Sequence, residues 1–230
     1  MKTTSRLSLE TLVNNIRQTL LPQLALVSDT PFDPVLVTRV PAPWQLVGTG
    51  NYAAVVYHPD YQNCVVKVYA PGREGWADEV EVYQRLGAHP AFSTCFHAEP
   101  EFLVLKRLYG ITLYDCLAKG KVIPKQVIQD IDCALAYARD RNLNPHDIHG
   151  RNVMMYQGRG LVVDISDFLK PETCTAWNDL KRAYDWFYRP VLAPLRVRVP
   201  YPILDWVRKT YRWFRHRFRR GSIGQSRYGH

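Results

Sequence analysis

Asp147, Asn152 and Asp164 supply two carboxylates and one amide within eighteen residues of sequence, a set that could bind a metal ion and act on a hydroxyl. A strand is predicted after Asn152, followed by a glycine-rich turn at 157–160 and a returning strand that ends just before Asp164. Because antiparallel strands bring these two ends together, an amide oxygen and a carboxylate could share one hard cation there. Asp147 would orient a hydroxyl nearby. The arrangement suits phosphoryl transfer from a magnesium nucleotide, and a hairpin with ordinary turn aspartates is the alternative interpretation.

A lysine in an apolar strand is the second candidate group. Three strands are predicted between residues 44 and 69, and Lys67 lies in the valine-rich third strand. A buried ammonium there is costly unless a carboxylate neutralises it. The helix predicted near 75–86 offers Glu79 and Glu81, which point about 200° apart, so only one of them can face Lys67. A solvent-exposed lysine on an edge strand is the alternative.

These groups together resemble the protein-kinase-like superfamily over residues 44–187. The D-x4-N loop formed by Asp147 and Asn152, with Asp164 after an apolar strand, is similar to the catalytic and metal-binding segments of that family. The resemblance implies that Asp147 is the catalytic base and that Asn152 and Asp164 hold Mg²⁺. The letters VVDIS around Asp164 look more like the atypical RIO kinases than like D-F-G, which suggests a small bacterial-type serine/threonine kinase.

The same resemblance implies where ATP would bind. Residues 48–55 are similar to the G-x-G-x-x-G-x-V loop of kinases, with Ala53 in place of the third glycine, although a pair of glycines between strands is also an ordinary turn. Such glycines let backbone N–H groups approach the phosphates. Lys67 would bridge the α- and β-phosphates and pair with Glu79. The implied nucleotide-binding residues are Gly48, Gly50, Val55, Lys67, Leu105 and Leu108.

Two departures from the family pattern concern regulation and substrate docking. Pro145-His146-Asp147 replaces H-R-D and so lacks the arginine that reads a phosphorylated activation loop, and Ile165-Ser166 replaces the Phe-Gly after Asp164. No A-P-E motif follows, and the next helix is expected about a dozen residues later. Its apolar face is predicted to contain Trp177, Leu180, Ala183, Tyr184 and Phe187. We therefore expect a minimal activation segment without the usual peptide-docking platform.

The expected architecture is an α+β, bilobal protein-kinase-like fold with a small β-rich N-lobe and a mainly helical C-lobe. The expected units are an N-terminal helix and connector at 1–40, the N-lobe at 41–108, the C-lobe at 109–198 and a basic amphipathic tail at 199–230. The N-terminal helix is predicted to run from residue 8 to about 27. The 230 residues are 47% hydrophobic, which is enough for a substantial core.

The cysteine pattern and the lack of long apolar runs indicate a cytoplasmic protein. The five cysteines are odd in number, are widely spaced and include no C-x-x-C pair, so we expect reduced thiols rather than disulfides or a zinc site. No apolar run approaches the ~18 residues of a membrane-spanning helix. A peripheral location at the inner membrane surface is compatible with the tail.

Most of the net charge of +9 lies in that tail. Residues 201–230 contain eight Lys or Arg against a single acidic residue, Asp205. An apolar stripe at helical spacing is formed by Leu204, Val207, Tyr211, Phe214 and Phe218. A basic, aromatic helix of this kind suits an anionic membrane surface or RNA, and it equally suits packing of the stripe on the C-lobe.

The sequence thus predicts an enzyme that uses ATP and Mg²⁺ to phosphorylate a hydroxyl, most simply a serine or threonine of a protein. The first alternative acceptor is a sugar, a lipid headgroup or another small molecule, which the missing docking platform favours. The second alternative is a pseudokinase that acts as a binding module. The altered residues around Asp147 and Asp164 permit it, whereas the retention of Lys67, Asp147, Asn152 and Asp164 opposes it.

Overall fold

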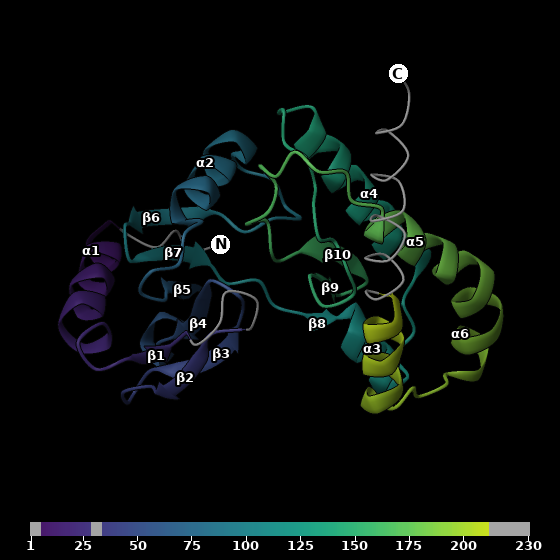
Figure 1. Ribbon diagram of the computed structural model, residues 1–230, viewed down its shortest axis with the longest axis horizontal. Coiled ribbons are helices and arrows are strands. Elements are labelled where there is room, and N and C mark those ends of the chain that lie inside the picture. The colour runs from purple at the N-terminus through teal and green to yellow at the C-terminus, as the bar shows by residue number, and fades with distance from the viewer. Residues whose placement is uncertain (1–5, 29–33, 212–230) are drawn as a thin grey trace, which may run out of the picture.

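The computed structural model describes residues 6–28 and 34–211, and its fold is α+β (Figure 1). One side of the molecule is rich in strands, and the other side is mostly helical. The predicted α+β class is therefore confirmed. Among the described residues, no helix is long and apolar enough to cross a membrane.

The strand-rich side is built from residues 6–106. Its elements are α1 (Arg6–Asn15), a π-helical turn (Ile16–Leu20), β1 (Ala25–Val27), β2 (Leu36–Arg39), β3 (Gln45–Thr49), β4 (Ala53–Tyr57), a 3-10 turn (Pro59–Tyr61), β5 (Cys64–Tyr69), α2 (Trp76–Leu86), β6 (Cys95–Glu99) and β7 (Phe102–Lys106). An antiparallel sheet has the order β3-β4-β5-β7-β6, and β1 pairs with β2 in a separate ribbon.

The helical side follows β7. Its elements are β8 (Ile111–Thr112), α3 (Leu113–Lys119), α4 (Lys125–Arg139), β9 (Val153–Tyr156), β10 (Arg159–Val162), α5 (Ala176–Ala183), a π-helical segment (Tyr184–Leu192) and α6 (Ala193–Leu195). β9 and β10 form the predicted hairpin, and β8 pairs with the other edge of β9. Residues 201–211 form a last helix. It lies on the helical side, in front of α3 in Figure 1.

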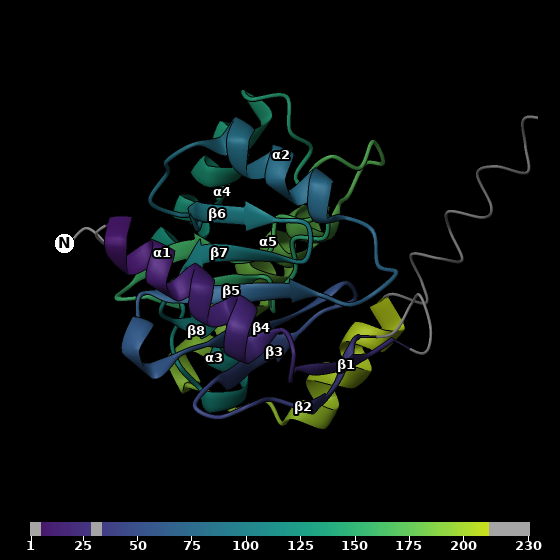
Figure 2. The ribbon, with the colours of Figure 1, turned by 90° about the vertical axis from the view of Figure 1, so that its left-hand side faces the viewer.

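The alternation of side chains along β5 decides which of them face α1 and which face α2. Val66 and Val68 are buried in one apolar cluster together with Leu12 and Ile16, the cluster that α1 covers where it crosses the sheet (Figure 2). Tyr69 is buried in the other cluster, together with residues of α2. Because successive side chains on a strand point to opposite faces, Lys67 lies on the same face as Tyr69. The strand pattern thus directs Lys67 toward α2 and away from α1.

The predicted extent of the N-terminal helix is wrong at its C-terminal end. The helix, including its π-helical turn, ends at Leu20, and Ala25–Val27 is a strand paired with Leu36–Arg39. Pro22 gives the physical reason, because it has no N–H to donate to the helix and its ring clashes with the preceding turn. Part of the predicted extended connector is therefore a strand of a two-stranded ribbon.

The β9–β10 hairpin is fixed to α4 by close packing and by one carboxylate. Asp130 of α4 accepts hydrogen bonds from Arg159 (2.7 and 2.9 Å) and from the backbone N–H of Gly160 (2.9 Å). The hydrogen bond from the Arg159 guanidinium is the main cause that lowers the pKa of Asp130 to about 2. A Cβ at Gly160 would clash with the backbone carbonyl oxygen of Val127. Only glycine lets the hairpin approach α4 so closely.

The predicted apolar face of the next helix is correct only in part. Trp177 and Tyr184 are buried and Leu180 is half-buried, but Ala183 is exposed, Phe187 is 56% exposed and Tyr188 is buried instead. After Ala183 the chain adopts a π-helical winding, whose i→i+5 hydrogen bonds place more residues in each turn. This change in winding shifts the buried face by one residue and turns Phe187 outward.

Candidate active site

Asn152 and Asp164 meet at one end of the β9–β10 hairpin. The backbone N–H of Val163 donates to the carbonyl oxygen of Asn152 at 3.0 Å, which closes the hairpin beside both side chains. Both residues line a cavity of about 490 Å³ between the large sheet and the helical side. The amide oxygen and the carboxylate that the sequence pairs therefore face one space.

Asp147 is held in an unusual backbone conformation next to this hairpin. Its φ is 55°, in the left-handed region, which costs a non-glycine residue about 1–2 kcal/mol. The Asn152 side-chain amide donates to the carbonyl oxygen of Asp147 at 3.1 Å and helps to maintain this conformation. The Asp147 carboxylate is half exposed and lies 3.7 Å from His149 Nε2. Asp147 is not one of the residues that line the cavity.

The surroundings of Asp147 favour its protonated form. Desolvation by the surrounding protein is the main cause that raises its pKa, and the negative charges of Asp167 and Asp164 raise the pKa further. His149 and His146 act in the opposite direction. A carboxylate with a raised pKa accepts a proton more readily, which is the property required of a general base.

Lys67 is the cationic centre of the cavity. Its Nζ donates to Glu79 Oε2 at 2.5 Å and lies 3.9 Å from Asp164 Oδ1. The Lys67 and Glu79 side chains are only 12% and 2% exposed. Burial alone would lower the pKa of Lys67, but the carboxylates of Glu79 and Asp164 outweigh it and raise the pKa, so the ammonium stays charged. Glu81, the other candidate partner, forms an ion pair with Arg85 instead.

Tyr69 completes this buried group and was not singled out in the sequence. Its hydroxyl donates to the same Glu79 oxygen at 2.5 Å. Burial is the main cause that raises the pKa of Tyr69 far above its ordinary value, so the hydroxyl remains a donor. The sequence could have indicated Tyr69, because it follows Lys67 by two residues and the side chains of both therefore lie on one face of β5.

Asp164 is kept ionised by its neighbours. The backbone N–H and the hydroxyl of Ser166 both donate to Oδ1, at 3.2 and 2.6 Å. Burial alone would raise the pKa of Asp164, but the Lys67 ammonium and the two Ser166 hydrogen bonds outweigh it and lower the pKa. Ser166 occupies the position where the resemblance expects the glycine of D-F-G, and here it orients the carboxylate.

The remaining predicted nucleotide contacts all lie around the same cavity. Its lining includes Gly48, Gly50, Val55, Leu105 and Leu108. Gly48 lies opposite Val55 in the β3–β4 pair, and a Cβ built on Gly48 would meet no atom within 4 Å. Packing within the chain therefore does not require a glycine at position 48, whereas a ligand that closely approaches the backbone would require it.

A hydrogen bond joins the glycine-rich loop to the segment after Asp164. Lys170 Nζ donates to the hydroxyl of Tyr52 at 3.3 Å and forms an ion pair with Asp167 at 2.8 Å. The same segment holds the loop that leads to Asp147, because Asn144 donates from its backbone N–H to the carbonyl oxygen of Phe168 at 2.8 Å. These residues are distant in sequence, and no local pattern indicates that they meet.

Arg151 is held by the helix at 201–211. Asp205 accepts from Arg151 Nη2 and from the hydroxyl of Tyr114, both at 2.8 Å, and the guanidinium lies over the Tyr114 ring at 4.2 Å. The sequence leaves open a role of Arg151 in supporting phosphate charge or in a structural salt bridge, and a salt bridge is present. Arg151 also lines the cavity, directly before Asn152. Asp205 therefore connects the C-terminal helix to the edge of the site.

The donor set at the end of the hairpin suits Mg²⁺. This ion prefers oxygen ligands, usually one or two carboxylates together with water and phosphate oxygens. The side-chain nitrogen of Asn152 already donates to Asp147, which leaves its amide oxygen as the ligand atom. Among the residues described, no group of three or more His, Cys, Asp or Glu side chains could hold a metal by themselves. A metal ion here would therefore need the oxygens of a bound nucleotide as well.

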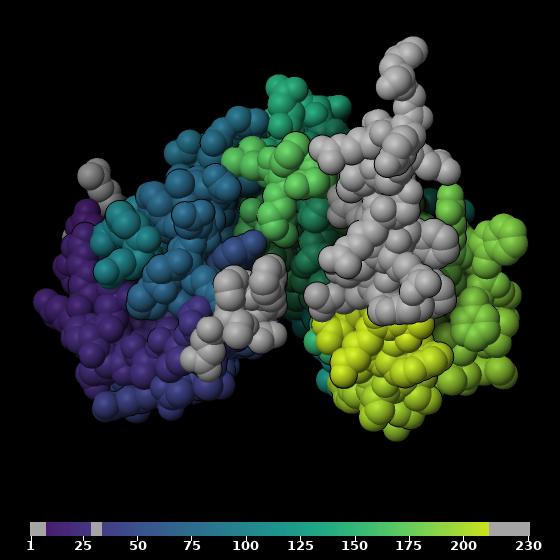
Figure 3. All heavy atoms as spheres, viewed as in Figure 1, coloured from purple at the N-terminus to yellow at the C-terminus, as the bar shows by residue number. Residues whose placement is uncertain are grey.

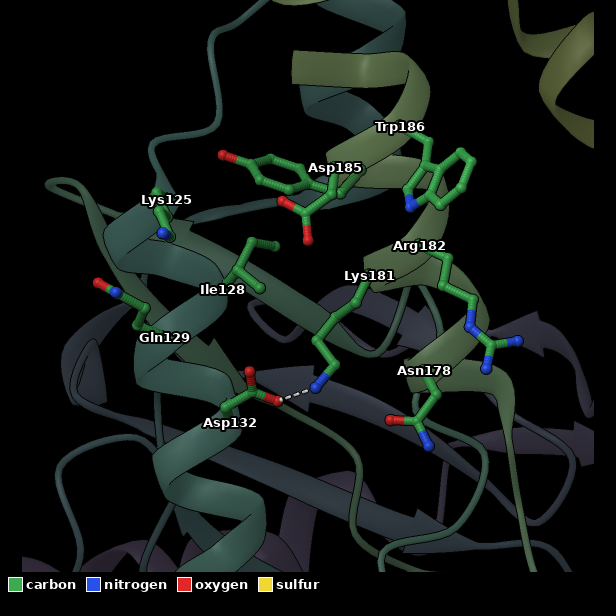
Figure 4. Close-up of a pocket in the computed structure, with 10 residues that line it drawn as sticks. Lys125, Ile128, Gln129, Asp132, Asn178, Lys181, Arg182, Asp185 and Trp186 are labelled. Carbon is green, nitrogen blue, oxygen red and sulfur yellow. Dashed lines mark hydrogen bonds and ion pairs between the residues drawn. The ribbon is translucent and has the colours of Figure 1, made fainter. Parts of the chain in front are cut away.

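A second depression lies between α4 and α5, away from these residues. It measures about 440 Å³, and Lys181 donates to Asp132 at 2.8 Å within it (Figure 4). Asp132 also accepts from Trp177 Nε1 at 2.7 Å. Its polar groups are thus engaged in holding α5 against α4, and we assign it no chemistry.

Part of the chain is similar in sequence to a known protein. The chain is 32% identical over 151 residues to "Putative serine/threonine-protein kinase YrzF" of Bacillus subtilis (strain 168), and the match covers 65% of this chain and 65% of that protein. The chain thus spans just under two thirds of the length of the relative. No protein-family model matches the chain. Among solved structures, a mutant form of the Mycobacterium tuberculosis PknI kinase domain is 24% identical with a TM-score of 0.41, over 65% of each chain.

Proposed function

We propose that the protein is a kinase that transfers the γ-phosphoryl group of MgATP to a hydroxyl, with a serine or threonine of a protein as acceptor. The observation that carries this proposal is the buried Lys67–Glu79 pair at 2.5 Å, which lies 3.9 Å from Asp164 inside a glycine-lined cavity. The sequence similarity to a protein named as a serine/threonine kinase supports the same conclusion.

In this proposal, Lys67 binds the phosphates of ATP. The Glu79 carboxylate holds the ammonium in place from the α2 side, and the Tyr69 hydroxyl donates to that carboxylate and orients it. The loop that contains Gly48 and Gly50 covers the phosphates, because glycines let the backbone come close to them, and Val55, Leu105 and Leu108 line the adenine. Asn152 and Asp164 hold Mg²⁺, which supplies charge neutralisation for the phosphates when it is bound.

Asp147 acts on the acceptor. The acceptor oxygen forms a bond to the γ-phosphorus while the bond from that phosphorus to the bridging oxygen of ADP breaks, and the electron pair of the broken bond leaves with ADP. The hydroxyl proton passes to the Asp147 carboxylate. The raised pKa of Asp147 suits this proton transfer. Arg151, at the edge of the cavity, supports the charge on the transferred group.

The domain division that accompanies this proposal is that of a two-lobed kinase. Residues 41–108 form the N-lobe and 109–198 the C-lobe, with the N-terminal helix and connector at 1–40 and the tail at 199–230. We include in the proposal that the kinase is RIO-like, because the sequence around Asp164 resembles that of the RIO kinases.

A small-molecule acceptor is the second candidate. It is favoured by the segment between β10 and α5, where residues 163–175 contain no helix or strand that could dock a peptide. A sugar or lipid headgroup that carries a hydroxyl would need only Asp147 and the cavity. The third candidate is a pseudokinase, whose cavity would bind a nucleotide without transferring its phosphoryl group.

Phosphotransfer by the purified full-length protein tests the proposal. Wild type is incubated with radiolabelled MgATP and either a generic protein or small-molecule extracts, next to Asp147→Asn and Asp164→Ala, and nucleotide binding is followed by thermal shift. We expect wild type to label an acceptor and both variants to fold without labelling. Nucleotide binding without any transfer would support the pseudokinase, and neither binding nor transfer would overturn the nucleotide site.

A further inference from the structure

We infer that the protein docks on an anionic lipid bilayer through one surface of its helical side, which we call the apolar–basic surface. Its apolar residues are Trp186, Phe187, Leu195, Ile203, Trp206 and Val207, and its basic residues are Arg182, Arg189 and Lys209. It is built from two segments, 182–195 and 201–211. The first of them lies before the basic tail predicted at 199–230. The inference does not rest on the proposed kinase activity.

The exposed apolar area is large and is carried by big side chains. Trp186 is 86% exposed, Leu195 72% and Trp206 67%. Tyr184 and Tyr188 form the buried side of the same π-helical segment, which forces Trp186 and Phe187 outward. Clusters of exposed apolar side chains of this kind mark interaction sites on otherwise water-soluble proteins.

The two segments lie next to each other. The hydroxyl of Tyr211 donates to Asp179 at 2.6 Å, which holds the end of the 201–211 helix beside α5, and the α5 helix continues into the segment with Trp186. Figure 3 shows both segments at the end of the molecule that is farthest from α1. Both segments therefore lie at one end of the molecule, where a single flat partner could contact both.

The charge on this surface is positive. Residues 181–211 contain seven Lys or Arg and two Asp. Asp205 is already paired with Arg151. Two of the basic residues pair with carboxylates outside this span, Lys181 with Asp132 and Arg182 with Asp179, and the net charge at this end stays positive. Figure 4 shows the Arg182 and Trp186 side chains projecting to the same side, and Arg189 is another exposed residue of the π-helical segment. Long basic side chains beside tryptophan suit the headgroup region of a bilayer.

The aliphatic members favour a bilayer over RNA. RNA is bound by phosphate contacts and by aromatic rings on which bases stack. Leu195, Ile203 and Val207 offer no such platform, whereas each of them gains by leaving water for the acyl boundary. A surface that carries both positive charge and aliphatic side chains therefore matches an anionic membrane.

Vesicle co-sedimentation of the full-length protein tests the inference. We expect binding to vesicles of phosphatidylglycerol and phosphatidylcholine, and weak binding to phosphatidylcholine alone. Trp186→Ser with Trp206→Ser should lower the partition coefficient about tenfold or more, because both side chains lose their apolar contact with the bilayer. The matched control is Leu36→Ser with Leu46→Ser, which removes exposed apolar residues on the strand-rich side and should leave binding unchanged.

A charge variant separates the electrostatic contribution. Arg189→Gln with Lys209→Gln should weaken binding to anionic vesicles about fivefold per charge, whereas Arg39→Gln with Arg139→Gln should not. Circular dichroism of each variant confirms that it is folded. Equal binding of wild type and the two-tryptophan variant would overturn the inference. So would binding to RNA but not to vesicles, or tryptophan-dependent self-association without vesicle binding. Phosphotransfer in solution should be the same in wild type and in the two-tryptophan variant.

Discussion

Replacing Glu79 by glutamine removes one charge from the buried centre of the site. Glu79 is 2% exposed and its partner Lys67 12%, so water screens the pair little. Breaking a buried ion pair by removing one partner costs about 3–5 kcal/mol, because the other charge stays buried. Asp164, 3.9 Å from the Lys67 ammonium, keeps part of the compensation. We therefore expect Glu79→Gln to lower the free energy of unfolding by about 3 kcal/mol, the lower end of that range.

Urea and thermal unfolding followed by circular dichroism measure this loss. For a domain of this size, a loss of about 3 kcal/mol lowers Tm by roughly 6–12 °C. Glu81→Gln is the matched control, two residues along the same helix. Its carboxylate is 47% exposed and pairs with Arg85 one turn away, so its removal should cost less than about 1 kcal/mol.

A second variant tests the cause of the loss. Lys67→Met with Glu79→Gln removes both charges and should recover much of the stability, because no unpaired ammonium remains buried. The reasoning is refuted if Glu79→Gln unfolds at the same urea concentration as Glu81→Gln. It is also refuted if the double variant is less stable than Glu79→Gln alone.

Four further variants each change a single residue. Gly160→Ala should lose about 2 kcal/mol or more in urea unfolding, because its Cβ would clash with a backbone oxygen of α4, whereas Gly48→Ala should fold normally and lose the thermal shift caused by MgATP. Asp147 has a raised pKa, so the folded state favours its protonated form. The free energy of unfolding should therefore fall as pH rises from about 3.8 through the raised pKa of Asp147. In Asp147→Asn, unfolding measured at several pH values should no longer show this fall. The same variant should not transfer phosphate. Asp205→Asn should speed hydrogen exchange in the helix at 201–211 and leave α4 unchanged, since Asp205 fixes that helix to Arg151.

Each of these outcomes has a contrary result. Equal stability of Gly160→Ala and Gly48→Ala would contradict the close packing of the hairpin on α4. A pH dependence that Asp147→Asn leaves unaltered would assign it to another carboxylate. Unchanged exchange in Asp205→Asn would show that other contacts, such as the hydrogen bond from Tyr201 to Asp115, are enough to hold the helix.

The sequence predicts best where a short-range pattern decides the structure. The valine-rich strand with Lys67 is β5 itself, and the helix that offers Glu79 and Glu81 begins within one residue of its expected start. Which of the two glutamates meets Lys67 follows from the helix period once one face is buried. The residues proposed for the nucleotide lie around one cavity because strand alternation and a hairpin place them there.

Features that depend on distant partners could not be predicted. β6 carries polar residues such as His97 and Glu99, and its strand character comes from pairing with β7. The contacts of Asp205 with Arg151 and of Lys170 with Tyr52 join segments that no local periodicity relates. In the tail, Leu204 is half-buried but Val207 is 51% exposed, so the predicted stripe does not pack as a whole. Phe214 and Phe218 of that stripe lie outside the described residues.

The hydrogen bond from Arg151 to Asp205 makes the helix at 201–211 and the loop before Asn152 thermodynamically dependent on each other. Arg151 precedes Asn152 at the cavity, and Asp205 is one residue from Trp206 on the apolar–basic surface. A bilayer that fixes the helix and a nucleotide that fixes the loop would then share a single coupling free energy. By reciprocity, lipid would change the affinity for nucleotide by the same factor as nucleotide changes the affinity for lipid.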